Sequence, residues 1–312
     1  MSGRDAPSAL AAAIDQNRRN ERVTRTWLLA PALTIILAIS ILPLGITVVY
    51  SFLTPGTYGG VTWEFSTDSY VQFLFQRDIF DDTLVFNSAY VSIFLRSIGL
   101  ALGATIGALI LGFPTAYFIA SKPREQRNIW LFLITLPFWT NLLIRTYAML
   151  LIIRDEGIIN IMLMKLGLIS SPLTILYTDT AVFIGLIYSF LPFMVLPIYA
   201  SLEKLDFSLV EAGYDLYANR LKVLFHVIVP LAKPGIVAGC ILVFIPALGA
   251  YITPELLGGG KKLMIGNMIA MQFGASRNWP FGSAAALILM ALVIIVLLVN
   301  ALAARRGTSS NG

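Results

Sequence analysis

The sequence predicts an all-α membrane protein whose six transmembrane helices form one bundle. Of its 312 residues, 57% are hydrophobic and 12% are charged, about half the charged fraction of soluble domains. A helix needs about 20 apolar residues to cross the hydrocarbon core, and six runs in this chain are long enough. They cover residues 27–52, 88–120, 129–153, 180–202, 235–254 and 281–304.

The first apolar run is predicted to be a retained span. Residues 1–26 are polar and place four arginines just before it, as the start of a signal peptide would. The run itself is uncharged for 26 residues, whereas the apolar segment of a signal peptide has about 7–15. We therefore expect a cytoplasmic tail over 1–26, a membrane domain over 27–304 and a second cytoplasmic tail over 305–312.

The segments between the spans differ in their predicted structure. Residues 53–87 hold turn formers, acids and several aromatics, which predicts an extramembrane loop with some fold of its own or contact with the membrane interface. Residues 157–179 are broken by Gly and Pro, so we expect an interfacial helix and a loop. The uncharged stretch 263–276 is too short to cross, and is expected to dip into the membrane or lie on its surface.

Small residues in two of the spans predict close helix packing. Gly99, Gly103 and Gly107 follow each other at intervals of four in the second span, and Gly235 and Gly239 do so in the fifth. This spacing places small residues on one helical face, where another helix can approach closely.

Two arginines lie inside predicted spans, near the outer boundary. Arg96 is close to the outer end of the second span, and its charge is expected to reach the headgroups. Arg145 shares a helical face with Phe138 and Asn141. At 1.5 Å per residue it lies roughly 25 Å from the inner end of the third span.

The distribution of Lys and Arg predicts that both termini are cytoplasmic. Six spans place both tails on one side, together with 121–128 and 203–234, and that side holds 14 of the 22 basic residues. No basic patch is interleaved with aromatic residues, so the net charge of +5 does not indicate binding of nucleic acid.

Residues 211–230, within the predicted loop 203–234, form the most polar segment in the second half of the chain. Its apolar residues recur at helical spacing, which predicts one or two short amphipathic helices on the membrane surface. Pro230 is expected to end the second helix, and Pro234 to lead the chain into the next span. Because the segment joins two spans directly, it can pass motion from a soluble partner into the bundle.

The chain shows no catalytic or metal-binding motif. GGGKK at 258–262 lacks the spacing and the Ser or Thr of a phosphate-binding P-loop. A single histidine and a single cysteine exclude most metal clusters, and no Gly-x-Ser-x-Gly turn occurs. We therefore predict a protein that is not an enzyme and that itself binds no cofactor or metal.

The segment 203–234 resembles the EAA loop of ABC-importer permeases. Four of its residues match that pattern: Glu211, Ala212, Val227 and Pro230. Three residues depart from it and stand in place of the usual Ala, Gly and Leu: Gly213, Tyr217 and Val229. The resemblance implies the fold of a type I ABC importer permease, whose EAA loop forms a coupling helix.

Within this loop, four residues are expected to dock in a groove of an ATPase subunit: Glu211, Ala212, Gly213 and Asp215. Ala212 and Gly213 are small, so the backbone of a partner can come close. Glu211 and Asp215 are four apart on one helical face and present two acceptors to the partner.

Further strings extend the resemblance over most of residues 85–300. They are FPTAY at 113–117, LPFWTNLLIRTYAML at 136–150, GLIYSFLPFMVLPIYASLE at 185–203 and FIPALGAYITPELLGGGKKLMIGNMI at 244–269. Together they are similar to permeases of bacterial spermidine/putrescine importers. The resemblance implies a complex in the bacterial inner membrane, surrounded by lipid. Its other members are a second homologous permease, an ATP-binding subunit dimer that holds ATP and Mg, and a periplasmic solute-binding protein.

A pathway for polyamines needs carboxylates and aromatic faces to hold ammonium groups. The candidates near the outer ends of the spans are Trp139, Asn141, Arg145, Tyr147, Asp179, Tyr188, Tyr251 and Glu255. The span interiors contain no carboxylate, and Arg145 would repel a polyamine or position a carboxylate. An importer permease for an amino-acid-like compound or an organophosphonate stays open. A secondary transporter would need embedded ionisable residues and inverted repeats, which are scarce here.

Overall fold

The structure is a computed structural model that describes residues 29–32, 34–77, 84–206 and 208–309. Within these residues, five helices are long and apolar enough to cross a membrane. They are Leu29–Ser51, α3 (Ala89–Ala120), α7 (Asp179–Leu202), the helical run Arg220–Leu248, and α13 (Trp279–Ser309) with an apolar part ending at Leu302. A bent pair of helices supplies the sixth span when the pair is counted as one. The predicted tail over 1–26 lies outside the described residues.

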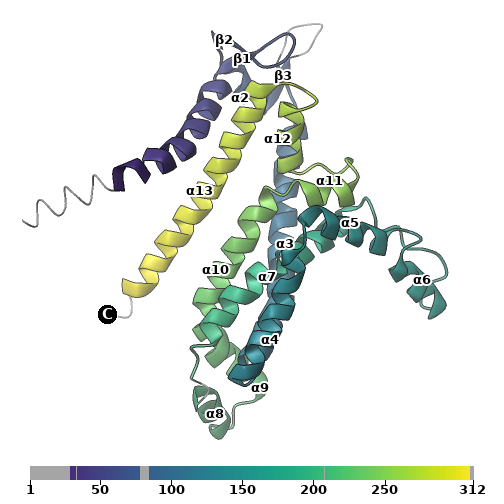
Figure 1. Cartoon of the computed structure of the whole chain (residues 1–312), viewed down its shortest axis with the longest axis vertical. Helices are drawn as coiled ribbons and strands as arrows, with labels where there is room; N and C mark the ends of the chain where they lie inside the picture. Colours follow the sequence, from purple (N-terminus) through teal and green to yellow (C-terminus); the bar gives the residue numbers. More distant parts are fainter. Residues whose placement is uncertain (1–28, 33, 78–83, 207, 310–312) are drawn as a thin grey trace, which may run out of the picture.

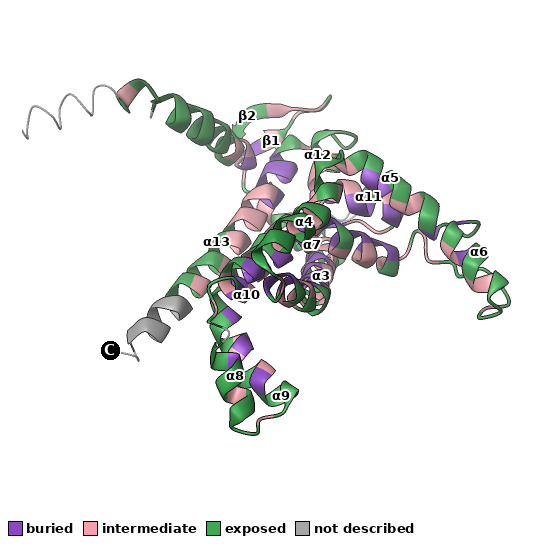
Figure 2. Cartoon of the chain, turned by 60° about the horizontal axis from the view of Figure 1, so that its bottom comes forward, coloured by how far each residue is buried: buried purple, intermediate pink, exposed green. Residues whose placement is uncertain are grey.

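The centre of the fold is formed by α7 packed between α3 and α10 (Val229–Leu248). Buried residues gather where these three helices meet (Figure 2). The glycines explain the close approach, because a Cβ on Gly103 would lie 3.0 Å from the Phe183 ring, and one on Gly239 would lie 2.8 Å from Met194 Sδ. The predicted small-residue faces are therefore used, except that nothing lies within 4 Å of a Cβ built on Gly99.

The third predicted span, 129–153, is broken rather than continuous. It consists of α4 (Arg124–Thr135), a 3-10 turn at Leu136–Trp139, and α5 (Leu142–Ile153). The two halves of the bent pair, Arg124–Trp139 and Leu142–Lys165, meet at 92°. The break follows from local chemistry: Thr140 is extended, and the Asn141 side chain restarts the helix by accepting a bond of 2.8 Å from Leu143 N. The expectation of one straight helix is corrected here.

The predicted segment 157–179 contains α6 (Ile158–Lys165) and a loop, as expected. The loop is fastened by Asn160, whose side chain is fully buried and bonds to both backbone groups of Leu173, at 3.0 and 2.9 Å. This pairing satisfies a buried amide that would otherwise cost stability.

The predicted break at Pro230 is wrong. α9 (Arg220–Val223), a π-helical turn at Leu224–Ile228 and α10 follow one another without interruption. Proline lacks the N–H that an α-helix uses and crowds the carbonyl four residues earlier. The wider turn just before Pro230 changes the hydrogen-bond register, which lets the helix continue through the proline. This helix also ends at Leu248, six residues before the predicted end of the fifth span.

The end of the fold opposite the loop after α7 carries small additional elements (Figure 1). Two antiparallel pairs and a short helix lie in 53–87: β1 (Leu53–Pro55) with β2 (Val61–Phe65), β3 (Phe75–Arg77) with β4 (Leu84–Phe86), and α2 (Asp68–Val71). The Phe52 ring stacks on Phe65 and contacts Tyr70, with centroids 5.7 and 5.3 Å apart. The predicted local fold of this loop is therefore present, as small sheets added to an otherwise helical protein.

After α10, two short helices lead into the last span. They are α11 (Ile252–Gly258) and α12 (Ile265–Phe273), and the second falls within the predicted short stretch 263–276. Ile265 and Met268 are fully buried, so α12 packs by its apolar face against the bundle. α13 then continues to Ser309, so the chain is still helical where the predicted tail over 305–312 begins.

Two spans are exposed within this chain. The helix Leu29–Ser51 has an apolar window with no buried residue, and that of α13 is 6% buried. In Figure 1 the helix Leu29–Ser51 and the later part of α13 stand away from the α3–α7–α10 centre, whereas Phe281 and Ala285 at the start of α13 are buried. Apolar faces of this kind contact lipid or another subunit in a membrane complex.

Candidate functional site

The loop between α7 and α10 is held to the bundle at its start. Asp206 accepts a hydrogen bond of 3.0 Å from Ser208 N through Oδ1, which begins α8 (Ser208–Asp215) and lowers the pKa of the Asp206 carboxyl. One turn later, Val210 is buried in the same cluster as Leu202 and Val223. The short helix is therefore fastened to both flanking spans.

The turn after α8 is a Schellman motif with tyrosine at its left-handed position. Tyr217 has φ +57°, its N–H donates to Tyr214 O at 2.9 Å, and Ala218 N donates to Gly213 O at 3.2 Å. Glycine is favoured at such a position because a side chain disfavours this conformation. The chain thus keeps the tight turn although Tyr217 stands where related loops have glycine.

The helix that follows the turn is capped by Asn219. Its Oδ1 accepts a bond of 2.8 Å from Lys222 N, and its carbonyl accepts from Val223 N at 3.0 Å. Because this helix continues into α10, the cap begins a 29-residue helix that reaches the centre of the bundle. A displacement of the loop is therefore a displacement of α10.

The four residues predicted to contact an ATPase do not share one environment. Glu211, Ala212 and Asp215 are exposed on α8. Gly213 is partly buried, and a Cβ built on it would lie 3.2 Å from Val223 Cγ2. Its small size thus lets α8 lie close to α9 inside the loop.

The loop also exposes large apolar side chains, among them Leu216 and Phe225, which belong to its predicted apolar face. The exposed fractions are 82% for Leu216, 98% for Tyr217 and 63% for Phe225. The same segment exposes the carboxylates of Glu211 and Asp215 and the basic side chains of Arg220 and Lys222, so this end of the molecule exposes large apolar and charged residues together. This composition is typical of a surface that another protein covers.

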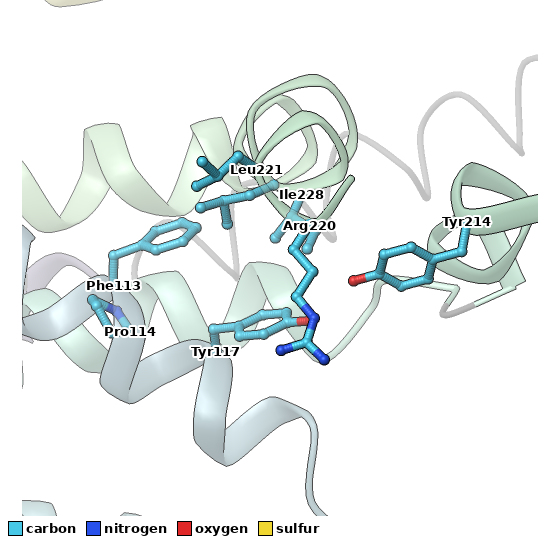
Figure 3. Close-up of a pocket in the computed structure, with 8 residues that line it drawn as sticks. Phe113, Pro114, Tyr117, Tyr214, Arg220, Leu221 and Ile228 are labelled. Atoms are coloured by element: carbon cyan, nitrogen blue, oxygen red, sulfur yellow. The ribbon is translucent and has the colours of Figure 1, made fainter. Parts of the chain in front are cut away.

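A pocket of about 720 Å³ lies between this loop and α3 (Figure 3). Its lining residues come from α3, α8, α9 and the π-helical turn: Phe113, Pro114, Tyr117, Tyr214, Arg220, Leu221, Leu224 and Ile228. None of the described residues that line it is acidic. Sequence reasoning did not find this pocket, because its two walls are about 100 residues apart in the chain.

At the other side of the bundle, Asp179 forms ion pairs with two basic residues. It pairs with Arg96 of α3, and its other oxygen lies 3.9 Å from Lys262 Nζ. Arg96 also donates to Leu263 O at 3.3 Å. Arg96 was expected to reach the headgroups, and instead it joins α3 to the start of α7. In the sequence Arg96 lies eight residues inside its predicted span and Asp179 lies one residue before its own, so the pattern along the chain does not pair them.

A second polar group surrounds Asn267 in α12. Its Nδ2 donates to Glu255 Oε2 at 2.7 Å and to Tyr251 O at 3.0 Å. The Glu255 carboxylate remains exposed, and so does the Tyr251 ring. The structure therefore brings together two of the predicted pathway residues through a residue that was not predicted.

Arg145 is the most buried of the predicted pathway residues, with 8% of its surface exposed. Its guanidinium lies 5.8 Å from the ring centres of Phe138 and of Tyr188, and donates to Pro137 O at 3.1 Å. Its Nε is buried and has no hydrogen-bond partner among the described residues. An arginine held between two aromatic faces keeps part of its hydrogen-bonding capacity open.

Within the part of the chain that the structure describes, the side chains of the remaining pathway candidates form no hydrogen bond or ion pair with these groups, although the Asn141 carbonyl accepts a backbone bond of 3.0 Å from Arg145 N. Trp139 and Tyr147 are 79% and 55% exposed, and the Asn141 side chain caps α5. The eight predicted residues thus fall into separate groups, and none of them lines the pocket beside the loop. Among the described residues no group of three or more His, Cys, Asp or Glu can hold a metal ion.

Comparison with protein families matches this chain to transport proteins. The profile of the family described as "Binding-protein-dependent transport system inner membrane component" covers residues 108–307. The spermidine/putrescine transport system permease protein PotB of Escherichia coli K12 is 43% identical over 249 residues, which are 80% of this chain and 86% of that protein. PotB of Haemophilus influenzae is 48% identical over 217 residues, or 69% and 76%. The inner membrane ABC transporter permease protein YdcU of Escherichia coli is 35% identical over 226 residues, or 68% and 72%.

Solved structures show the same fold. A chain of a bacterial ABC transporter involved in the import of the acidic polysaccharide alginate superposes with a TM-score of 0.65 at 18% identity, over 93% of this chain and 99% of that chain. The alginate transporter in complex with its oligosaccharide-bound periplasmic protein gives 0.60 at 16%, over 89% and 94%. At this identity the likeness defines the architecture, which is that of type I ABC importer permeases.

Proposed function

The chain belongs to the family of binding-protein-dependent transport system inner membrane components, and from that premise we propose that it forms half of the translocation pathway of an ATP-driven polyamine importer. Its substrate class is putrescine or spermidine. The observation that carries the substrate is the identity of 43–48% to permeases named for spermidine and putrescine.

The loop after α7 is the coupling element of this importer. Glu211, Ala212 and Asp215 lie exposed on α8 and contact a groove of the ATPase, while Gly213 keeps α8 against α9. Support comes from the continuous helix Arg220–Leu248, because a rigid helix carries a movement of the loop into α10. The ATPase dimer holds ATP and Mg, so this chain contributes motion and no hydrolytic residue.

The other partners follow from the same assignment. A second homologous permease covers the exposed apolar helices together with lipid, and a periplasmic solute-binding protein delivers the substrate. Both termini and the coupling loop face the cytoplasm, in agreement with 14 of the 22 basic residues on that side.

The predicted pathway residues have different parts in this proposal. Glu255 is the exposed carboxylate beside an exposed tyrosine, Tyr251, and suits an ammonium group. Asp179 is already paired with Arg96 and Lys262, so it has less capacity for a cationic substrate. Trp139, Tyr147 and Tyr188 supply aromatic faces near the bend of the third span.

One observation favours a second class of substrate. Arg145 is buried, is 5.8 Å from two aromatic rings, and has no carboxylate partner among the described residues. A cation in this position suits the carboxylate of an amino-acid-like compound or an organophosphonate better than a polyamine.

Two measurements on the assembled complex test the assignment. The chain, purified from membranes, is expected to bring down an ATPase, and putrescine or spermidine uptake into vesicles is expected to require ATP hydrolysis. Uptake driven by an ion gradient without an ATPase would contradict the importer. The ligand held by the cognate binding protein tests the substrate separately, because a carboxylate or phosphonate ligand with no polyamine affinity would overturn only the polyamine.

A further inference from the structure

The pocket between α3 and the proposed coupling loop, which is the loop after α7 over residues 203–234, has a polar end built from three side chains. Figure 3 shows the Arg220 guanidinium beside the Tyr117 ring, with the Tyr214 hydroxyl directed toward them from α8. Arg220 forms no ion pair with any residue that the structure describes. A guanidinium and two hydroxyls, with no carboxylate among the residues that line the pocket, form a site for an anion with several oxygens, such as a phosphate group.

The rest of the pocket is apolar. Phe113 and Pro114 of α3 form one wall, and Leu221, Leu224 and Ile228 form the other. The volume of about 720 Å³ is far larger than an inorganic phosphate needs, and lies in the range of sites for organic ligands. A ligand that fills both ends is an amphiphile with an anionic head and a hydrocarbon part.

The position of the pocket along the spans selects the kind of amphiphile. Tyr117 is three residues before the end of α3 at Ala120, and the next residues, 121–128, are polar and basic. Arg220 is the first residue of the long helix that enters the membrane. The polar end is therefore at the level where hydrocarbon meets headgroups, and the apolar walls continue toward the bilayer.

From these observations we infer that the pocket binds an anionic glycerophospholipid, whose phosphate is held by Arg220 with Tyr117 and Tyr214, and whose acyl chain lies along Phe113, Leu221 and Leu224. The lipid bridges α3 to α8 and α9, so it holds the coupling loop against the bundle. Its assignment to the cytoplasmic leaflet rests on the proposed function, but its binding does not.

The test compares lipid retention by full-length variants. The chain is purified in detergent, mixed with phosphatidylglycerol or phosphatidylcholine, and analysed by native mass spectrometry. Phosphatidylglycerol is expected to bind the unmodified chain at least about tenfold more tightly than Arg220→Gln, since a charge-assisted bond of this kind is strong. Lys222→Gln is the matched control: it removes the same charge two residues away, outside the pocket, and is expected to retain lipid.

Two further variants separate the two ends of the pocket. Tyr117→Phe removes one hydroxyl and keeps the ring, and is expected to weaken phosphatidylglycerol retention severalfold. Leu221→Trp fills the apolar end and is expected to lower the retention of long-chain lipid while leaving glycerol phosphate binding unchanged. Equal binding of free glycerol phosphate and phosphatidylglycerol would show that the apolar walls contribute nothing, and would overturn the lipid.

Other outcomes also overturn the proposal. Equal loss of lipid in Arg220→Gln and Lys222→Gln would mean that only net charge matters. Binding of phosphatidylcholine as tight as that of phosphatidylglycerol would remove the anionic selectivity. Lipid that binds the isolated chain and is absent from the assembled complex would show that a partner subunit occupies the pocket. None of these measurements uses transport, so failure of the importer assignment would leave them valid.

Discussion

A methyl group on Gly213 would lie 3.2 Å from Cγ2 of Val223, so α8 and α9 touch at the one position of the coupling loop that has no side chain. The neighbouring Ala212 is exposed. Gly213 therefore serves packing within the loop, while Ala212 is the one of the two that remains open to the proposed docking of a partner.

Replacing each of these residues with leucine should give different failures. Gly213→Leu is expected to force α8 away from α9. The free energy of unfolding of the purified chain, followed by thermal unfolding, should fall by about 1–3 kcal/mol, the usual cost of overpacking. Ala212→Leu should leave that stability unchanged and reduce the amount of ATPase that co-purifies. Gly213→Ala is the mild control, because Val223 must move only slightly and alanine favours the helix. Equal stability of both leucine variants would contradict the internal contact.

Tyr217 should be replaceable by glycine with a gain in stability. The residue has φ +57° and is 98% exposed, so the tyrosine ring contributes little packing while its Cβ disfavours the turn. We expect Tyr217→Gly to stabilise the chain by about 1 kcal/mol and Tyr217→Val to destabilise it. Thermal unfolding of the two variants in detergent measures this difference, and a less stable glycine variant would show that the tyrosine ring matters more than the turn.

Reversal of charge on α8 should uncouple hydrolysis from transport. Glu211 and Asp215 are exposed, and a buried charge-assisted contact to a partner is worth about 1.5–3 kcal/mol. Glu211→Lys is therefore expected to weaken ATPase docking about tenfold or more, with normal abundance of the chain in membranes. Glu125→Lys, at an exposed residue in the first turn of α4, is the control for the change in net charge. Normal uptake by the Glu211→Lys complex would argue against the docking role.

The parts of the fold that follow from apolar run length were predictable. α3 and α7 begin and end within one residue of the predicted spans 88–120 and 180–202, because polar residues bound these runs on both sides. The bend before α5 was not, since Asn141 reads as one polar residue in a span until its side chain is seen to cap a new helix. The continuous helix through Pro230 was also missed, because a π-helical turn has no signature in residue type.

The exposed face of the proposed coupling loop could be predicted from the sequence, whereas the contacts of the predicted pathway residues could not. The exposed position of Glu211 follows from helical spacing alone. The contacts of Asp179 and Arg145 depend on which elements meet in space. The two residues of the pair Arg96–Asp179, and likewise those of Arg145–Tyr188, are more than 40 positions apart in the chain. Pattern along one segment predicts which face is apolar, and carries no information on such distant partners.

The ion pair between Arg96 and Asp179 should stabilise the junction of α3, α7 and the segment before α12. Both side chains are partly exposed, at 25% and 48%, so solvent reduces the gain and we expect a coupling of about 1 kcal/mol. Asp179→Asn is expected to be more harmful than Lys262→Gln, because it leaves two cations beside each other without their common carboxylate. It also removes the partner of Arg96, whose Nε is buried and has no hydrogen-bond partner among the described residues. A double-mutant cycle of Arg96→Gln and Asp179→Asn, read by thermal unfolding of the full-length chain, measures the coupling. Lys262→Gln serves as the control at 3.9 Å, where a smaller loss is expected. Strictly additive effects of the two substitutions would show that the pair contributes no interaction energy, and that Arg96 acts through its bond to the Leu263 carbonyl alone.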